Sequence, residues 1–333
     1  MHTILQTGQH DCFDSSGRII PCPGSGQDGE FRSGLPWPTP RFTVSSRTVL
    51  DNLTGLTWSR DANPGIFPCT WQQALEQIRD LNRQQWSGHA DWRLPDRREL
   101  RSLMDYQARN PALPHGHPFA NVFLGWYWTS TTAAINPAYA WYVHMEGARM
   151  FYGRKNQEYL FWPVRGTSDI LAATGQKRCF DTAGNRIPCH GSGQDPECPA
   201  IAWPVPRLLW EGNQVLDRLT GLAWHTKADL TGKPVTWAEA LQAVAQLNRS
   251  ETGPKPAWRL PNINELESLV DAGHHSPALP ADHPFTSLRD AYWSATTSFF
   301  EPDWAWVLYL DKGACGVGHK PGRSFHTWPV RDT

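Results

Sequence analysis

The chain has 333 residues, a length typical of about two domains. Its 31 basic and 32 acidic residues nearly cancel, which excludes a field of one sign that would draw the protein onto nucleic acid or an anionic membrane. Charged residues make up only 19%, while Trp (18), Pro (28) and Gly (27) are abundant, so we expect a compact, loop-rich globular protein.

No apolar run approaches the ~20 residues that a membrane-spanning helix needs. Residues 1–6 lack the basic and apolar regions of a signal peptide. The sequence therefore predicts no transmembrane segment, and it leaves open whether the protein is cytoplasmic or is exported by a leader that is not visible in this sequence.

Each half of the chain begins with a cysteine-bearing segment. Cys12 and Cys22 have the same spacing as Cys179 and Cys189. Close, repeated pairs in loop-rich sequence favour two small disulfides, with free thiols or zinc ligands as the alternatives. Three cysteines have no counterpart in the other half, and their pairing stays open: Cys69, Cys198 and Cys315.

A hairpin and an amphipathic helix follow in each half. An Asp and a Gly delimit the turns at residues 51–55 and 217–221. Thr70 with Gln73, and Thr236 with Glu239, then match the capping box that begins a helix. Apolar residues recur on one face of the next three turns, so we expect this helix to pack against a core.

The sequence Trp-Arg-Leu-Pro occurs at residues 92–95 and 258–261, 166 residues apart. Asp or Asn and then Glu follow it, which predicts a second capped helix. The arginine could clamp an anion, but its place among Trp, Leu and Pro favours a buried Arg–Glu pair. This predicted structural motif comprises Trp92, Arg93, Glu99, Trp258, Arg259 and Glu265.

The rest of each half predicts antiparallel strands, because aromatic and β-branched residues alternate with polar ones. These strands fall at residues 127–132, 140–144 and 161–165, and again at 292–297, 305–309 and 327–331. Two helices followed by a sheet indicate an α+β fold. We expect two domain-sized repeats, residues 1–167 and 168–333, each a cysteine segment followed by a domain.

Several motifs occur in the same order in both halves: Asp-x-x-Thr-Gly-Leu-x-Trp, Trp-Arg-Leu-Pro-x-x-x-Glu-Leu, Tyr-Trp, Ala-Trp and a closing Val-Arg. This series resembles the bacterial Lcl C-terminal domain family over about residues 48–166 and 214–332. The resemblance implies a C-type-lectin-like fold, with two helices packed on a curved antiparallel sheet, in an extracytoplasmic protein. The best-understood relative is the end domain of a collagen-like adhesin that binds sulfated glycosaminoglycans.

The chain departs from that relative in two ways. It has no collagen-like Gly-X-Y tract, and Pro163 and Pro329 precede the closing Val-Arg where a Cys is expected. We therefore look for ligand contacts in loops where the two copies differ.

Three kinds of ligand contact are candidates there, with simple packing as the alternative for the aromatic residues. Unpaired aromatic residues could stack on sugars, and basic loops could meet sulfate, with an ordinary solvated rim as the alternative. The sequence Glu301-Pro302-Asp303 resembles the motif that coordinates Ca²⁺ in C-type lectins. The candidate ligand residues are Trp126, Asn136, Tyr139, Arg149, Arg154, Lys155, Glu301, Asp303, Trp304, Lys320 and Arg323.

We therefore expect a non-catalytic recognition or adhesion protein of the periplasm, cell surface or medium. Its expected partner is a glycan or a polyanionic polysaccharide, with no nucleic acid and no cofactor except Ca²⁺, which stays open. One alternative is a structural protein of a surface fibre that binds surface proteins and forms oligomers. Another is an enzyme of the formylglycine-generating type, which shares the broad fold class by resemblance and uses cysteines. The sequence has no Gly-x-Ser-x-Gly, His-Glu-x-x-His or phosphate-binding loop to support an enzyme.

Overall fold

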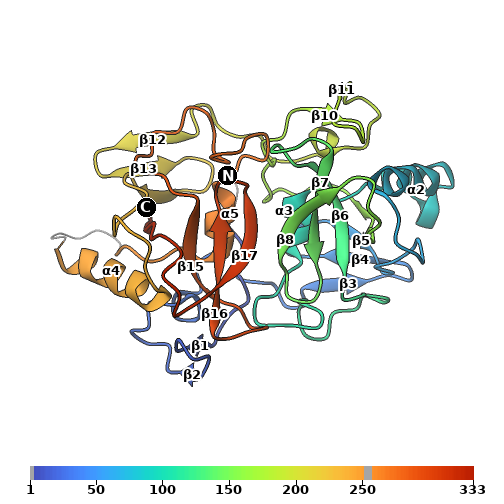
Figure 1. Ribbon diagram of the computed structural model, residues 1–333. Coiled ribbons are helices and arrows are strands. Elements are labelled where there is room, and N and C mark those ends of the chain that lie inside the picture. Colours follow the sequence, from blue (N-terminus) through green and yellow to red (C-terminus); the bar gives the residue numbers. More distant parts are fainter. Residues whose placement is uncertain (1–3, 251–256) are drawn as a thin grey trace. The chain divides into compact units, whose positions relative to one another are not determined.

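The computed structural model describes residues 4–250 and 257–333 (Figure 1). The described chain forms two compact units. Unit 1 combines the described parts of Met1–Leu35, Trp203–Val270 and His274–Thr333, and unit 2 combines Pro36–Ala202 with Asp271–Gly273. This division differs from the expected halves 1–167 and 168–333, because each domain is joined by the cysteine segment of the other half.

Unit 2 begins with a small antiparallel sheet in the strand order β3-β4-β5-β9. Its strands are β3 (Phe42–Val44), β4 (Thr48–Asp51), β5 (Thr57–Ser59) and β9 (Val164–Arg165). The predicted turn joins β4 to β5. The Asp51 carboxylate accepts bonds from the Leu53 N–H and the Thr54 hydroxyl, and Gly55 takes a φ of 77°. This sheet brings the first and last strands of the domain together.

Two helices and a second sheet complete this domain. The helices are α2 (Trp71–Arg83) and α3 (Arg97–Ser102), with a 3-10 turn, η1 (Trp86–Gly88), between them. The second sheet contains β6 (Trp126–Thr132), β7 (Tyr139–His144) and β8 (Met150–Arg154), with β7 in the middle. Both predicted capping boxes form, at Thr70 with Gln73 and at Asp96 with Glu99.

The cysteine segment of unit 2 follows its domain in the chain. It contains β10 (Cys179–Phe180), β11 (Arg186–Ile187) and the 3-10 turn η2 (Asp195–Glu197). β10 and β11 form a hairpin that the Cys179–Cys189 disulfide closes.

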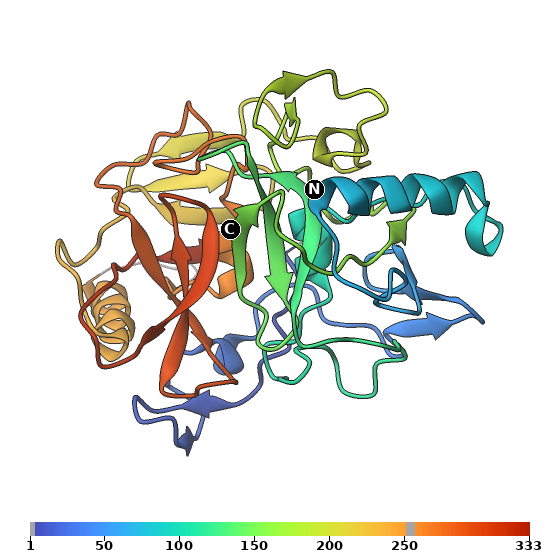
Figure 2. The ribbon, with the colours of Figure 1, turned by 45° about the vertical axis from the view of Figure 1, so that its right-hand side comes forward.

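Unit 1 repeats this design, with its cysteine segment at the other end of the chain. The domain strands are β12 (Leu208–Glu211), β13 (Gln214–Asp217), β14 (Leu222–His225), β15 (Ala291–Thr297), β16 (Trp304–Tyr309), β17 (Ala314–His319) and β18 (Val330–Asp332). Its helices are α4 (Trp237–Ser250) and α5 (Ile263–Ser268). The segment provides β1 (Cys12–Phe13), β2 (Ile19–Ile20) and α1 (Asp28–Phe31), and Cys12–Cys22 is a disulfide. The blue hairpin β1–β2 lies beside the red strands of this unit (Figures 1 and 2).

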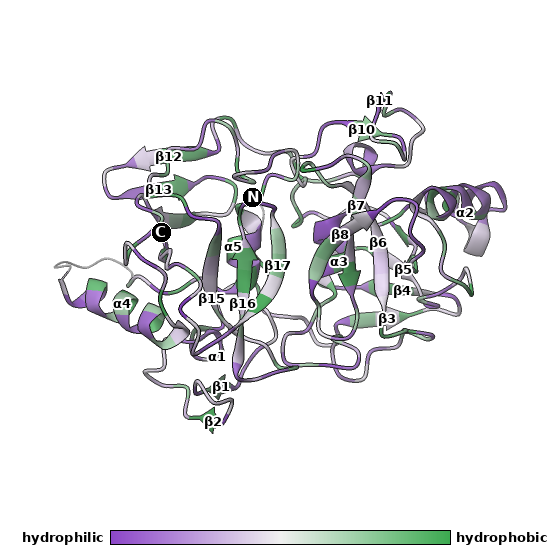
Figure 3. Cartoon of the chain, viewed as in Figure 1, coloured by the Kyte–Doolittle hydropathy of each residue, from purple (hydrophilic) through white to green (hydrophobic). Residues whose placement is uncertain are grey.

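Most of the repeated tryptophans belong to the cores. Trp71 of α2 packs with Trp128 of β6, and its indole N–H donates to the Thr129 carbonyl oxygen at 2.7 Å. Trp237 of α4 makes the equivalent bond to Ser294 at 2.7 Å. The exposed side of α2 is largely hydrophilic, as expected for a helix with one buried face (Figure 3).

The Trp-Arg-Leu-Pro motif ties a helix to the end of a sheet. The Arg93 peptide exchanges two hydrogen bonds with Val164 of β9, at 2.9 and 3.0 Å. Its guanidinium binds the Glu99 carboxylate through two bonds of 2.5 and 2.6 Å. Arg259 and Glu265 repeat this pair with the same distances. Both glutamates also accept a bond from the first residue of their capping box, so one carboxylate serves two structural tasks.

The structure shows two tandem domains dominated by antiparallel sheets, with few helices and with a disulfide preceding each domain in the sequence. Within the described part of the chain, every helix is too short or too polar to cross a membrane.

Candidate functional site

In unit 1 the cysteine hairpin covers the loop that carries the predicted calcium motif. A Cβ atom placed on Gly17, at the hairpin tip, would lie 2.9 Å from the Asp303 nitrogen and 3.2 Å from the Pro302 Cβ. The Lys320 amine donates to the Asp14 carbonyl oxygen at 3.1 Å and lies 4.1 Å from the centre of the Trp237 ring. The hairpin therefore occupies one side of the loop before β16.

Unit 2 repeats this contact. The Lys155 amine donates to the Phe180 and Asp181 carbonyl oxygens at 3.1 and 3.2 Å, and it lies 4.1 Å from the Trp71 ring centre. Lys155 and Lys320 are both 0% exposed. Burial lowers the pKa of each amine to about 7. This corrects the prediction that the two lysines face a ligand, because each amine is buried and donates to the hairpin.

A buried aspartate fixes the other end of each segment. Asp28 accepts bonds from the Thr7 hydroxyl at 2.8 Å and from the Thr296 hydroxyl of β15 at 2.6 Å. Burial raises the pKa of Asp28 to about 6. Asp195 accepts bonds from Thr174 and Thr131 in the same way in unit 2. The sequence shows the repeated Gly-Ser-Gly-Gln-Asp, but nothing in it marks the two threonines of the sheets as partners.

The other candidate cations make separate local contacts. The Arg154 side chain is exposed, and its Nε donates to the Tyr139 hydroxyl at 2.9 Å. Arg323 forms an ion pair with Glu239 of α4. Arg149 is partly buried, and its carbonyl oxygen accepts a bond from the His144 N–H. Arg154 and Arg323 are thus each bound by a neighbouring side chain of their own unit.

The acidic loop and its counterpart are organised by local bonds. The Glu301 carbonyl oxygen accepts a bond from the Trp304 N–H at 2.8 Å, and the Asp303 carboxylate lies 3.6 Å from the His319 ring nitrogen. The Trp304 ring also packs on His319. In the other copy, the Asn136 side chain accepts a bond from the Ala138 N–H. Among the described residues, no three His, Cys, Asp or Glu side chains are grouped as a metal site.

Trp126 lies in an aromatic surface on the second sheet of unit 2, which we define as Trp126, Tyr142 and His144. Trp126 pairs with His144 across β6 and β7, and Trp128 pairs with Tyr142, so all four side chains share one face. The Trp126 ring centre lies 4.4 Å from that of Tyr142 and 4.5 Å from that of His144. Trp128 is buried under α2, whereas the three residues of the aromatic surface are partly exposed.

The His144 ring of this aromatic surface is neutral, and the charges of Glu146 and Arg149 act on it from nearby. The His144 Nδ1 atom accepts a bond from the Glu146 N–H at 3.2 Å, which places the ring proton on Nε2. Burial lowers the pKa of His144, so the ring carries no charge near neutral pH. Gly153 makes room for Tyr142, since a Cβ atom there would lie 2.5 Å from the tyrosine ring. The surface thus combines aromatic faces with polar groups at their edges.

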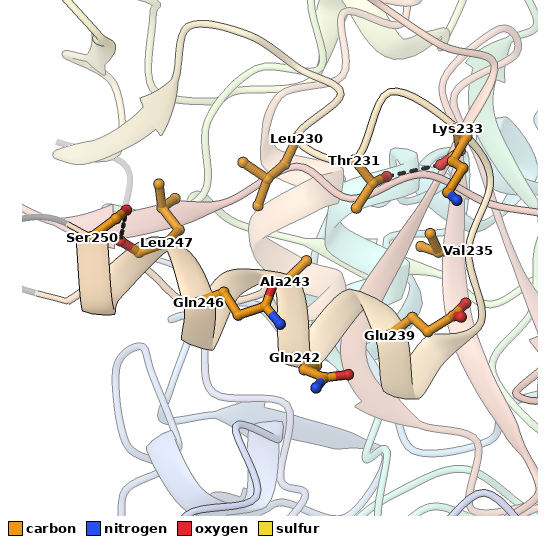
Figure 4. A pocket seen from close by; sticks show the side chains of 10 residues that line it. All are labelled: Leu230, Thr231, Lys233, Val235, Glu239, Gln242, Ala243, Gln246, Leu247 and Ser250. Atoms are coloured by element: carbon orange, nitrogen blue, oxygen red, sulfur yellow. Dashed lines mark hydrogen bonds between the residues drawn. The ribbon is translucent and has the colours of Figure 1, made fainter.

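A shallow groove of about 530 Å³ runs along α4 in unit 1 (Figure 4). Apolar side chains form its inner part, and polar residues of α4 and of the preceding loop form its rim. Its lining residues are Leu230, Thr231, Lys233, Val235, Glu239, Gln242, Ala243, Gln246, Leu247 and Ser250. Its one carboxylate, Glu239, is already bound to Arg323 and to the Thr236 N–H. This groove was not predictable from the sequence, because its loop residues have no special spacing.

Cys69, Cys198 and Cys315 are not in disulfides, and Cys69 and Cys315 are buried. Burial raises the pKa of Cys69 to about 11 and also raises that of Cys198. A raised pKa disfavours the thiolate, which is the reactive form.

The comparisons agree with this architecture. No curated protein matches the chain. The family model of the Lcl C-terminal domain matches residues 47–165 and 213–331, which together are more than half of the sequence. The two matches coincide with the two sheet-and-helix domains and leave out both cysteine segments. The protein therefore belongs to the Lcl C-terminal domain family and contains two tandem copies of that domain.

Proposed function

We propose that this protein is a non-catalytic, extracytoplasmic recognition protein with lectin-like domains, and that it binds glycans through the aromatic surface Trp126, Tyr142 and His144. The partly exposed Trp126 ring carries the proposal. Aromatic rings with a polar edge offer an apolar face to the C–H face of a sugar and hydrogen bonds to its hydroxyl groups.

The two copies of the domain differ at this surface. The positions of Trp126, Tyr142 and His144 correspond in strand register to Ala291, Val307 and Tyr309. Ala291 and Val307 are buried. The same fold thus forms without the aromatic surface, which supports a role other than folding for Trp126.

The charges favour a neutral glycan over a sulfated one. A polyanion is bound by several exposed cations on one surface. Here Lys155 and Lys320 are buried under the hairpins, and Arg323 is paired with Glu239. The aromatic surface itself contributes a neutral histidine.

Two further observations support the compartment and the lack of catalysis. Disulfides persist in oxidising compartments, and the chain has two, at Cys12–Cys22 and Cys179–Cys189. The buried Cys69 thiol, with its raised pKa, is unlike the activated thiol that the formylglycine-generating alternative requires.

A glycan array with the full chain tests the proposal, read at low and high salt and with or without EDTA. We expect binding to neutral glycans that survives high salt, because stacking on aromatic rings is little affected by ionic screening. Trp126→Ala should reduce that binding at least about tenfold, the loss of roughly 1.4 kcal/mol expected for one stacked ring.

Trp210→Ala is the matched control, because Trp210 is the most exposed tryptophan of the described chain at 68% and lies outside the aromatic surface. Binding that is lost equally in both variants would remove Trp126 from the site. Binding only to sulfated glycans, and only at low salt, would replace the neutral ligand by a polyanion. If the folded protein binds no glycan in any condition, the proposal fails.

A structural protein that binds other proteins is the second candidate function. Its support comes from four exposed apolar residues on two loops of unit 2: Ile66, Phe67, Phe123 and Leu124. The corresponding positions of the other copy hold Gly232, Lys233, Arg289 and Asp290. The Asp61–Ala120 bridge joins these two loops. Exposed apolar groups of this kind are typical of protein interfaces. Pull-down with wild type and with Phe67→Lys tests this function, since the substitution copies the residue of the other repeat.

A further inference from the structure

Each domain is completed by a cysteine segment, but the two segments have opposite positions in the chain. In unit 2 the segment, residues 168–202, directly follows the domain at 47–165. In unit 1 the domain at 213–331 is completed by residues up to 35, which lie almost 180 residues upstream. One domain therefore binds the segment that directly follows it, and the other domain binds a segment of the same kind from a distant part of the chain.

The two docked segments use equivalent bonds. The Asp28–Thr296 bond of unit 1 corresponds to the Asp195–Thr131 bond of unit 2. Gln9 exchanges two bonds with the Thr297 main chain, at 2.9 and 2.8 Å, and Gln176 donates to the Thr132 carbonyl oxygen. Each hairpin gives a carbonyl oxygen to the buried lysine of its domain.

The packing contacts are equivalent as well. A Cβ atom on Gly26 would lie 3.5 Å from Leu241 of α4, and one on Gly193 would lie 3.5 Å from Leu75 of α2. Each domain thus offers the same docking surface, and this surface fits either kind of connection to the segment. The chemistry of the contact does not depend on how the segment is connected to the domain.

We propose that the N-terminal cysteine segment is exchangeable, so that the C-terminal domain of one molecule can accept residues 4–35 of a second copy of this chain. Exchange makes no new kind of contact, because the bonds within one molecule and between two molecules are the same. The partner is a second copy of the same protein. This inference is independent of the proposed glycan binding.

Connectivity determines which form dominates. Within one molecule the chain holds the segment near its acceptor at a fixed effective concentration, so the closed monomer prevails when the protein is dilute. The proline-rich stretch at residues 36–40 begins where the segment ends, and proline favours extended connectors. At high concentration, docking onto the next molecule can repeat head to tail, because the donor and the acceptor are different surfaces.

Two complementary variants of the full chain test the exchange. Asp28→Lys weakens the segment, because an ammonium group replaces the carboxylate that Thr296 binds. Thr296→Asp weakens the acceptor, because two carboxylates then face each other. Each variant alone has a defective internal contact. Mixed together, they can form a dimer in which one contact is native and the other is an ion pair.

Native mass spectrometry of the separate and mixed variants provides the measurement. We expect about tenfold more dimer in the mixture than in either variant alone, equivalent to roughly 1.4 kcal/mol in favour of exchange. The double variant, Asp28→Lys with Thr296→Asp in one chain, should be a folded monomer. Its circular dichroism shows whether the two substitutions are compatible with the fold.

Unit 2 offers the matched control. Asp195→Lys and Thr131→Asp make the same change where the segment is tied to its domain by residues 166 and 167. These two control variants should each be less stable than wild type, and a mixture of them should form no mixed dimer. A mixed dimer formed equally well by the control pair would overturn the assignment of exchange to the N-terminal segment.

A second measurement uses the wild type and does not depend on how the variants fold. Two isotopically distinct preparations, with disulfides intact, are refolded together from urea at micromolar to millimolar concentration. The fraction of mixed dimers and larger species should rise with concentration. If wild type refolds only to monomers throughout this range, or if the folded variant mixture contains only monomers, the proposal is refuted.

Discussion

The buried lysines predict an unusual dependence of stability on pH. Lys155 and Lys320 have pKa values of about 7 in the folded protein, against 10.5 for an ordinary lysine. Below pH 7 both the folded and the unfolded chain carry these protons. Between pH 7 and 10.5 the unfolded chain binds more of them, so the free energy of unfolding increases as the pH rises.

The size of this increase follows from the protonation difference. From pH 7.5 to 8.5 a lysine of pKa about 7 is mostly neutral in the folded state and charged in the unfolded state. Each lysine should then contribute about 1.2 kcal/mol over that pH unit, close to the limit of roughly 1.4 kcal/mol for one proton. The two lysines together should contribute about 2.4 kcal/mol.

Urea denaturation at pH 7.5 and 8.5 measures this increase. Lys155→Met and Lys320→Met should each reduce it by about half, and the double variant should abolish it, because methionine has a similar shape but no proton to release. Lys177→Met and Lys227→Met are the controls, since both of these lysines are exposed. They should leave the pH dependence of wild type unchanged.

The comparison of slopes is what refutes or supports the reasoning. Each methionine variant also loses its hydrogen bond to the carbonyl oxygen of Asp14 or Phe180, which shifts the free energy of unfolding at every pH. Loss of the titrating amine changes only the slope of the free energy of unfolding against pH. Equal slopes for wild type and the double methionine variant would show that burial lowers the pKa of neither amine. The docked hairpins would then leave both amines accessible to water.

Other predictions concern the contacts that hold the segments and the Arg–Glu motif. Asp28 has a folded pKa of about 6 against 3.8, so its contribution is complete below pH 3.8 and is lost as the pH rises through 6. Asp28→Asn should remove that decline, which amounts to about 2 kcal/mol between denaturation curves at pH 4 and 6. Glu265→Ala should cost about 3 kcal/mol, because it leaves the buried Arg259 guanidinium with only the exposed Asp332 carboxylate as its ion-pair partner. Adding Arg259→Met should recover part of this loss in urea denaturation, and a double variant as unstable as the single one would contradict the reasoning. Cys12→Ser with Cys22→Ser should lower stability by about 3 kcal/mol through the ten-residue loop, and an unchanged melting temperature would show that the hairpin docks without its disulfide.

Local features of the structure were predictable from the sequence. The capping boxes at Thr70 and Asp96 need only residues three positions apart, and both form as expected. The pairing of Cys12 with Cys22 was favoured for the same reason, since its partners are close in sequence. The two-domain repeat and its family were also identified from ordered motifs.

The placement of the segments could not be predicted in this way. Both segments carry the same docking residues, and both domains carry the same acceptors, so the sequence satisfies either assignment equally well. The bond between Gln9 and Thr297 crosses 288 residues and has no local signal. The burial of Lys320 depends on this assignment, because a carbonyl group of the distant hairpin covers its amine. A lysine in a Gly-rich loop otherwise predicts an exposed charge.

The aromatic surface was predictable only in part. Trp126 was identified because it has no tryptophan counterpart in the second copy. Tyr142 and His144 were not singled out, because their place beside Trp126 depends on the register of β6 and β7.

The staggered pairing of segments and domains has a consequence for how such chains lengthen. Duplication of one repeat adds one cysteine segment and one acceptor domain together. If the added segment docks on the domain before it, as residues 168–202 do, the first segment still has the last domain to complete. A gene can therefore gain or lose whole repeats without creating an unmatched surface. In this architecture the number of segments and the number of acceptor domains therefore stay equal.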